Sequence, residues 1–505
     1  MEQTKSTGNA FTFNKAYLKR TIWIGLAFFG ILLVWQLYNS YCSPMLSFMF
    51  ARSDYPEAVA AGLAAGCKDM KSLLAQGFIT QEMYLQLQWK VGIIMALDNI
   101  AALFIMPIFG NLSDKTKTKL GKRMPYIIVG SVVTAIALPF IPVFFSNSMN
   151  TTGVELGGMI AGLISMMIVV IIFMMSYRSP AVALMPDLTP KPLRSKANGI
   201  INVVGYVGGA IGSVMAIVIS VSGNIDGSAK SLWMLEIPFI LCSVVLLLSL
   251  GLLLYKVREN KLHAELDAEI ARGDVLGESA EVVSEGQKLS KTNIRNLLLI
   301  IAAEMFWFMS LNAVETFQTN YAMFWLDCSS AGGAIMTVVS GAASVVGFIV
   351  AGYIADKIGR KWTIFLGICI VTVCYICYSL VPQVPTNPAN PLSATLPFYF
   401  FIMLPAIGFG SSLIHICSFP LVVDYCSKDK VGRYTAIYYS ASMLAQSITP
   451  IAIGFIFRFT TWQALPIYSA SLMAVAGLIF FFVKAPKRSD TGENAKGLEA
   501  MGDID

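Results

Sequence analysis

The sequence has few charged residues and almost no histidine. Of its 505 residues, 13% are charged and only two, His263 and His415, are histidines. A soluble protein carries roughly twice that share of charge, about a quarter of its residues. The low charge argues against a soluble protein, and the scarcity of histidine argues against a metal centre. We also find no nucleotide-binding loop and no nucleophile motif, so the sequence predicts neither an enzyme nor a bound cofactor.

The nine cysteines are scattered along the chain. Most of them fall inside apolar runs, namely Cys242, Cys369, Cys374, Cys377 and Cys417. A cysteine in such a setting behaves as a small hydrophobic residue. The net charge of +6 has an explanation in membrane orientation, so a nucleic-acid partner is not expected.

Apolar residues are abundant, at 56% of the chain, and the mean hydropathy is +0.67. Stretches of about 20 apolar residues recur along the whole length, each long enough to cross a bilayer core as a helix. No small-residue cleavage site follows the first stretch, so we interpret it as a span and not as a signal peptide. We predict an all-α membrane protein with twelve transmembrane helices, at 21–45, 89–110, 124–145, 156–180, 198–221, 233–255, 296–317, 332–354, 362–381, 396–420, 435–457 and 464–484.

Lysine and arginine are distributed unevenly between the two sides of these spans. The side that holds the N-terminus takes 30 of the 36, and the other side takes six. By the positive-inside rule, both termini are cytoplasmic and the protein is a multi-pass protein of the plasma membrane, or of the inner membrane in a bacterium. The predicted domains are a cytoplasmic N-terminus (1–20), a six-helix bundle (21–255), a charged cytoplasmic linker that is partly an amphipathic helix (256–295), a second six-helix bundle (296–485) and a disordered cytoplasmic tail (486–505).

Two pairs of cytoplasmic loops indicate an internal repeat. "GNLSDKTKTKLGKR" (110–123) corresponds to "GYIADKIGRK" (352–361), 242 residues later. "DLTPKPLR" (187–194) corresponds to "DYCSKDKVGR" (424–433), 237 residues later. The two halves therefore look like copies of one six-helix unit. Parallel repeats of this kind are typical of transporters with a substrate site at mid-membrane between the halves.

The loop at 110–123 recurs at 352–361 in a chain with twelve predicted spans. On this basis residues 20–485 resemble the major facilitator superfamily. "GNLSDKTKTKLGKRMPY" together with "SPAVALMPDLTP" is similar to the glycoside–pentoside–hexuronide:cation symporters and the related sucrose–proton symporters. The resemblance implies uptake of a sugar with a cation by alternating access, and it implies that the loops form a latch for one conformation. Static anchoring of the helix ends is the alternative. The latch residues would be Gly110, Asp114, Lys115, Gly121, Arg123 and Asp187 in the first half, and Gly352, Asp356, Lys357, Gly359, Arg360, Asp424 and Arg433 in the second.

Acidic residues inside the apolar runs are the candidates for cation coupling. A charged side chain at the bilayer centre costs about 2.5–3.5 kcal/mol on insertion scales, so such residues face the protein interior or water. Asp98 and Glu304 lie near the midplane, and Glu315 follows Glu304 by 11 residues on the same face of its helix. Each could carry a coupling proton, or could be a permanently paired carboxylate that fixes helix packing.

Arg178 has two interpretations, either a headgroup anchor or a group that pairs with Asp98 and binds substrate oxygens. Sucrose–proton symporters carry an arginine in the comparable stretch, whereas sodium-using relatives place additional acids in the first and fourth spans. This difference favours protons over sodium as the coupling ion. Sugars also need aromatic faces and planar hydrogen-bonding groups. Besides Arg178, the predicted substrate-binding residues are Trp35, Gln36, Tyr38, Asn39, Asn198, Asn202, Trp307 and Asn312, with ordinary packing as the alternative for each.

Three kinds of transporter remain open. The first is a proton-coupled importer of a glycoside or disaccharide. The second is a carrier of lysolipids or other amphiphiles, and the third is a proton-driven polyspecific exporter. The polar groups within the spans favour a polar ligand over a lipid, but they do not distinguish import from export. The expected partners are a sugar, a coupling cation and the lipid bilayer, and no obligate protein partner is evident.

Overall fold

The computed structural model describes residues 14–67, 69–149, 151–190, 193–219, 229–280, 291–385, 396–425 and 431–484. In this part of the chain, twelve spans are helical, long and apolar enough to cross a membrane. They confirm the predicted all-α membrane fold and are formed by α1 (Lys15–Asp54), α4 (Gln81–Lys115), α5 with α6 (Met124–Ala137, Phe140–Ser148), α7 (Gly153–Asp187), α8 (Arg194–Val218), α9 (Ala229–Lys256), α11 (Lys291–Phe324), α12 (Ser330–Ile358), α13 (Arg360–Ser379), α14 (Phe400–Asp424), α15 (Val431–Ile456) and α16 (Ala464–Phe481).

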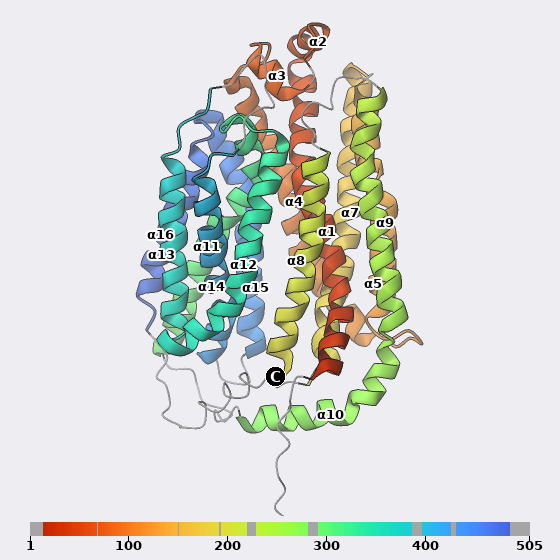
Figure 1. Ribbon diagram of the computed structural model, residues 1–505, viewed down its shortest axis with the longest axis vertical. Coiled ribbons are helices and arrows are strands. Elements are labelled where there is room, and N and C mark those ends of the chain that lie inside the picture. Colours follow the sequence, from red (N-terminus) through yellow and green to blue (C-terminus); the bar gives the residue numbers. More distant parts are fainter. Residues whose placement is uncertain are drawn as a thin grey trace, which may run out of the picture.

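Short helices mark the two ends of the bundle (Figure 1). The helices α2 (Pro56–Ala64) and α3 (Met70–Ala75) lie at one end, and α10 (Glu259–Ala280) lies across the other. We call the end with α10 the inner face, because the positive-inside rule predicts that it is cytoplasmic. The end with α2 and α3 is the outer face.

Several helices extend well beyond their predicted spans. The first span was predicted at 21–45, whereas α1 runs from Lys15 to Asp54. Hydropathy detects only the apolar core of a helix, while hydrogen bonding continues it into polar sequence. The start of α1 is fixed by Asn14, whose Oδ1 accepts the backbone N–H groups of Ala16 and Tyr17 at 3.0 Å. The N-terminal residues before Asn14, the predicted tail (486–505) and part of the linker (281–290) lie outside the described residues.

The helices before and after α10 form two halves that meet along two seams. At one seam α4 packs along α15, and at the other α8 packs along α12. Within the halves, α1 lies against α8 and α9, while α11 lies against α15 and α16. The halves therefore contact each other through helix pairs that are distant in sequence.

Small residues allow the backbones of α4 and α15 to approach closely in their outer portions. A Cβ atom on Gly92 would lie 2.1 Å from the carbonyl oxygen of Pro450, and one on Gly454 would lie 2.7 Å from that of Gln88. Neither position has room for a side chain. Close backbone approach at glycine is a common way to hold membrane helices together, because burial from lipid provides little driving force.

A layer of buried polar side chains joins the halves toward the outer face. Asn320 of α11 donates through Nδ2 to Ser43 Oγ of α1 at 3.1 Å and to Gln88 Oε1 of α4 at 3.2 Å. All three residues are buried with essentially no exposed surface. We call Ser43, Gln88 and Asn320 the outer seal, since this layer closes the space between the halves on that side.

Replacing Gly92 with alanine should destabilise the protein, although alanine is the better helix former by about 1 kcal/mol. The added Cβ forces α4 away from Pro450, and overpacking of this kind costs about 1–3 kcal/mol. The melting temperature in detergent should therefore fall. Gly251→Ala on α9 is the matched control, because a Cβ there meets no atom within 4 Å, and it should leave the melting temperature unchanged or raise it. Equal melting temperatures for the two variants would contradict this account of the seam.

Candidate functional site

The centre of the molecule holds a polar contact between the two halves. Glu315 of α11 accepts hydrogen bonds at Oε1 from Trp35 Nε1 at 3.3 Å and from Asn39 Nδ2 at 3.5 Å. Glu315 is exposed, and both donors on α1 are partly exposed, although these residues lie within the bundle. The outer seal lies about one helical turn farther out, at Ser43 and Asn320, and is buried. Glu315 therefore carries solvent-accessible surface, whereas the outer seal next to it does not.

Arg178 of α7 completes this central site. Its guanidinium carbon lies 5.6 Å from the centroid of the Trp35 ring, a cation–π arrangement. The guanidinium also interacts electrostatically with Asp98 and Glu315. A headgroup anchor would point toward the membrane surface, whereas Arg178 lies over the Trp35 ring within the bundle. We call Trp35, Asn39, Asp98, Arg178 and Glu315 the central site.

Asp98 lies at the midpoint of α4, 17 residues from each end, and only 3% of its surface is exposed. Its Oδ1 accepts the side-chain amide of Asn99 at 2.7 Å. The structure records no direct ion pair between the described side chains of Asp98 and Arg178, so the contact predicted from sequence is replaced by an interaction at longer range. The carboxylates of Asp98 and Glu315 thus both interact electrostatically with the one guanidinium group of Arg178.

The other predicted substrate-binding residues on α1 and α8 line the edges of this site or pack elsewhere. Gln36 is partly exposed, and its Nε2 donates to Ser40 Oγ at 3.4 Å. Tyr38 is buried close to Asp98, where the two groups interact electrostatically. Asn202 donates to the backbone carbonyl of Asn198 at 2.8 Å, one turn earlier on α8. Asn202 therefore uses its side-chain donor within its own helix, and the Asn198 side chain is exposed.

The two predicted residues on α11, Trp307 and Asn312, are both buried. Trp307 is fully buried and packs edge-on against Phe480 of α16, with 6.1 Å between ring centroids. Asn312 is buried as well, at 7% exposure. Trp307 therefore faces the core of its own half. Sequence position alone placed them near the midplane, but it could not show which way each side chain points around the helix.

Glu304 and Glu315 lie in different surroundings despite their predicted common face. Eleven residues separate them, which corresponds to about 16 Å along the helix axis. Glu304 is fully buried in its own half, next to the Tyr438 hydroxyl group of α15. That hydroxyl group lies 2.7 Å from Ser418 Oγ of α14. Glu304 is therefore a second buried carboxylate, separate from the central site.

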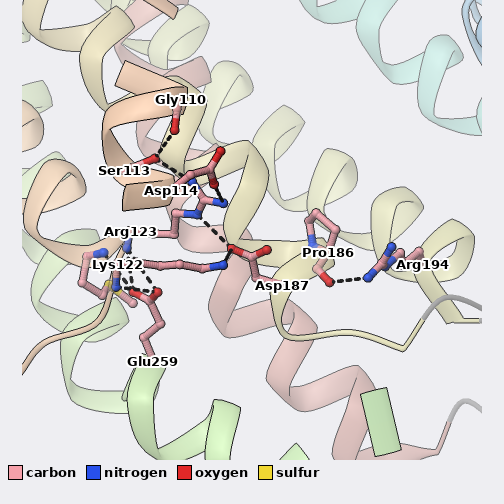
Figure 2. Close-up of polar contacts among 10 residues, drawn as sticks. Gly110, Ser113, Asp114, Lys122, Arg123, Pro186, Asp187, Arg194 and Glu259 are labelled. Atoms are coloured by element: carbon pink, nitrogen blue, oxygen red, sulfur yellow. Dashed lines mark hydrogen bonds and ion pairs between the residues drawn. The ribbon is translucent and has the colours of Figure 1, made fainter. Parts of the chain in front are cut away.

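At the inner face, the first predicted latch loop forms a compact polar cluster (Figure 2). Arg123 donates through Nε to Asp187 Oδ2 at 2.8 Å and through Nη1 to Ser113 Oγ at 2.6 Å, and it also forms an ion pair with Asp114. These contacts connect α4, α5 and α7 within one half. Lys115, at the end of α4, is exposed and belongs to the solvent-facing side of the loop.

Glu259 of α10 is a member of this cluster that the sequence did not reveal. Its carboxylate accepts the backbone N–H groups of Lys122, Arg123 and Met124 at 2.9–3.1 Å. Helix α5 has no side-chain cap of its own, so Glu259 supplies the negative charge and the acceptors that its first turn needs. Gly121 is required here because its φ is +122° and a Cβ would lie 2.1 Å from Glu259 Oε2. We call Asp114, Arg123, Asp187 and Glu259 the inner brace.

The second latch loop is described only in part. Gly359 ends α12 with φ +85°, a conformation suited to glycine, and Arg360 begins α13 directly after it. Lys357 lies in the last turn of α12, and a Cβ on Gly352 would meet nothing within 4 Å. The side chains of the remaining predicted members, Asp356, Asp424 and Arg433, lie outside the described part of the chain.

No three histidine, cysteine, aspartate or glutamate side chains converge on one point within the described ranges. Cys374 and Cys377 have the C-x-x-C spacing, but both are free thiols on the transmembrane helix α13. Cys374 is buried and Cys377 is exposed. Such residues in an apolar helix pack as small hydrophobic side chains.

The sequence matches the family model of the Major Facilitator Superfamily over residues 70–389 and 297–501. The chain belongs to this superfamily. It is accordingly a multi-pass membrane transporter for small molecules and not an enzyme.

Solved structures with this facilitator fold include the inward open xylose transporter XylE from E. coli, with a TM-score of 0.60 at 14% identity, covering 94% of this chain and 98% of that chain. A mutant of the nucleoside transporter NupG matches with a TM-score of 0.54 at 11% identity, over 92% of this chain and 99% of that one. The peptide transporter POT in complex with sulfate matches with a TM-score of 0.56 at 13% identity, over 92% and 93%. At these identities the likeness shows the fold alone. No curated protein matches the sequence significantly.

In this facilitator, Glu259→Gln should loosen the linker helix α10 from the bundle. The amide presents only one oxygen and no charge to three backbone N–H groups, and hydrogen bonds to a charged group contribute about 1.5–3 kcal/mol. Proteolysis within the linker should therefore be faster than in the wild type. Glu265→Gln on the same helix is the control, because Glu265 is exposed and, among the described residues, its contact is an ion pair with Lys261 at 3.8 Å. Equal cleavage rates for the two variants would show that Glu259 does not hold α10.

Proposed function

We propose that this transporter is a proton-coupled symporter that takes up a glycoside or disaccharide by alternating access, as in the glycoside–pentoside–hexuronide family that its loops resemble. The observation that carries the proposal is the central site. Aromatic, amide, guanidinium and carboxylate groups from both halves converge there, inside the outer seal and accessible to solvent.

The central site has the chemistry that a sugar needs. The ring of Trp35 offers a flat surface for sugar C–H groups, and Arg178 and Asn39 offer planar hydrogen-bonding groups for hydroxyl oxygens. Glu315 is an acceptor for sugar hydroxyl groups and contacts both donors on α1. A substrate bound here would touch both halves at once, as a transported molecule between two repeats does. A lysolipid would instead require a broad apolar surface, which this set of residues does not offer.

Proton coupling is supported by the imbalance of charge around Arg178. Two carboxylates, Asp98 and Glu315, interact with this one arginine, and Asp98 is buried. A charged carboxylate that is buried without a cation in contact costs free energy, and uptake of a proton removes that cost. In the proposed cycle Asp98 binds a proton when Arg178 engages the substrate or Glu315. Asp98 releases the proton when Arg178 turns back to it. Glu304 is proposed as a second proton-binding carboxylate because it is fully buried in the other half.

Asp98→Asn should abolish accumulation of sugar while exchange of sugar across the membrane continues, because the amide keeps the shape of the carboxylate but cannot take up a proton. We would measure uptake of labelled disaccharides and glycosides into proteoliposomes, with an inward proton gradient and then with sodium alone. Asp54→Asn is the matched control, since Asp54 forms an exposed ion pair with Lys90 on the outer surface, and it should accumulate sugar normally.

Each result of that measurement has a definite meaning. Accumulation driven by sodium alone would show that sodium, and not the proton, is the coupling ion. Normal accumulation by Asp98→Asn would remove Asp98 from the coupling path and make Glu304→Gln the next variant. Absence of sugar transport under every gradient would refute the symporter proposal and favour an amphiphile carrier. Export of added drugs by the same proteoliposomes would favour the exporter.

Trp35→Phe should weaken substrate binding, because it keeps most of the aromatic surface but removes the Nε1–H group that donates to Glu315. Glu315, the proposed acceptor for sugar hydroxyl groups, is then held on α1 by Asn39 without Trp35, so KM should rise while kcat changes little. Trp362→Phe is the control, because Trp362 is exposed at the inner end of α13. An unchanged KM for Trp35→Phe would argue that the substrate binds elsewhere.

A further inference from the structure

The outer face carries a buried ion pair that joins the two halves. Lys71 lies on α3, in the segment between α1 and α4, and Asp327 lies in the connection between α11 and α12. Lys71 Nζ is 2.9 Å from Asp327 Oδ1, and it also donates to the carbonyl oxygens of Asp327 and Cys328. The side chains are only 2% and 4% exposed. We call Lys71 and Asp327 the outer clamp.

The segments that present these two side chains are themselves fixed. Helix α3 begins with a capping box, in which Asp69 Oδ1 accepts the Ser72 backbone N–H at 2.8 Å and Ser72 Oγ accepts the Asp69 backbone N–H at 3.0 Å. On the other half, the backbone at Asp327 has a φ of +57°, which is uncommon for residues other than glycine.

The connection that carries Asp327 is held by its neighbours. Trp325 Nε1 donates to the carbonyl oxygen of Val381 at 2.9 Å, and the carbonyl oxygen of Trp325 accepts the N–H of Val384 at 2.8 Å. Such surroundings maintain a backbone conformation that would otherwise be unfavourable, and conformations of this kind concentrate at functional sites. Both partners of the outer clamp thus lie in segments that are held by contacts besides the ion pair itself.

The outer clamp lies beyond the outer seal, since Asp327 follows Asn320 by seven residues on the outer side of α11. An opening between the halves at the outer face would draw Lys71 and Asp327 apart, because each belongs to a different half. Closing the clamp removes both ions from water, and this desolvation opposes the attraction between them. Separation returns both ions to water. A buried ion pair of this kind is therefore suited to reversible closure, because the hydration of both ions on opening offsets the loss of their attraction. An apolar contact would gain no such hydration when it opens.

We propose that the Lys71–Asp327 ion pair is the gate that holds the outer side of the transporter closed, and that it breaks in each transport cycle. The proposal rests on the proposed alternating-access function, but not on the identity of the substrate. It assigns the segment with α3 the role of an outer lock, while the inner brace connects the first half to the linker helix α10.

The test measures access to the central site from the outer side without any substrate. Asn39→Cys is introduced into the full-length chain, and its reaction with a membrane-impermeant maleimide added outside is compared with that of the same chain lacking the new cysteine. In this background Lys71→Met keeps the aliphatic stem but removes the charge, and it should speed labelling by about tenfold or more because Asp327 loses its buried partner. Asp327→Asn should give a smaller increase, since asparagine tolerates positive φ and leaves the two carbonyl contacts of Lys71 in place.

The control is Lys90→Met, which removes an ion pair of similar length, 2.7 Å to Asp54, that is exposed and lies within one half. Its labelling rate should equal that of the Asn39→Cys protein. Equal rates for Lys71→Met and Lys90→Met would overturn the gate. If Lys71→Met does not fold, judged by size-exclusion chromatography, Asp327→Asn decides, and labelling no faster than the control overturns the gate. The labelling experiment measures no transport. Its result therefore stands even if the proteoliposome assay shows no proton-coupled sugar uptake.

Discussion

A polar group inside a bilayer must find its partner within the protein, and this constraint organises the whole molecule. The twelve spans satisfy their backbone groups as helices. Their few charged side chains then have to meet one another or face water. Arg178, Asp98 and Glu315 come from three different helices and gather at one place between the halves. The central site is therefore the place where these charges meet inside the bundle, and it is also the place where we propose that the substrate binds.

The same constraint explains why the halves meet as they do. Lipid provides little force to hold helices together, so contact depends on close approach at small residues and on buried hydrogen bonds. Gly92 and Gly454 bring two backbones together at the seam of α4 and α15. The outer seal then closes the remaining space with amide and hydroxyl groups. Both kinds of contact can separate without leaving a charge in lipid, which suits a carrier that has to open there.

The inner and outer faces hold their polar clusters differently. At the inner face, the inner brace ties the loop after α4 to α7 and to the linker helix α10 on one side of the molecule. At the outer face, the outer clamp crosses from one half to the other. The sequence repeat drew attention to the inner loops as a latch. The described contacts of the first inner loop lie within one half and reach the linker helix α10, whereas the outer clamp joins the two halves.

Hydropathy, charge and motif spacing are local properties of the chain, and they were enough to predict the twelve spans, an orientation for them and the repeated inner loops. The sequence also singled out Asp98, Arg178 and Glu315, since charge within an apolar run is visible without a structure. Tertiary structure alone decided that Trp35 meets Glu315 across 280 positions, that Trp307 faces the core and that Lys71 meets Asp327. These outcomes depend on how each helix is rotated and on which helices are neighbours. Packing between distant segments sets both, and no local pattern records it.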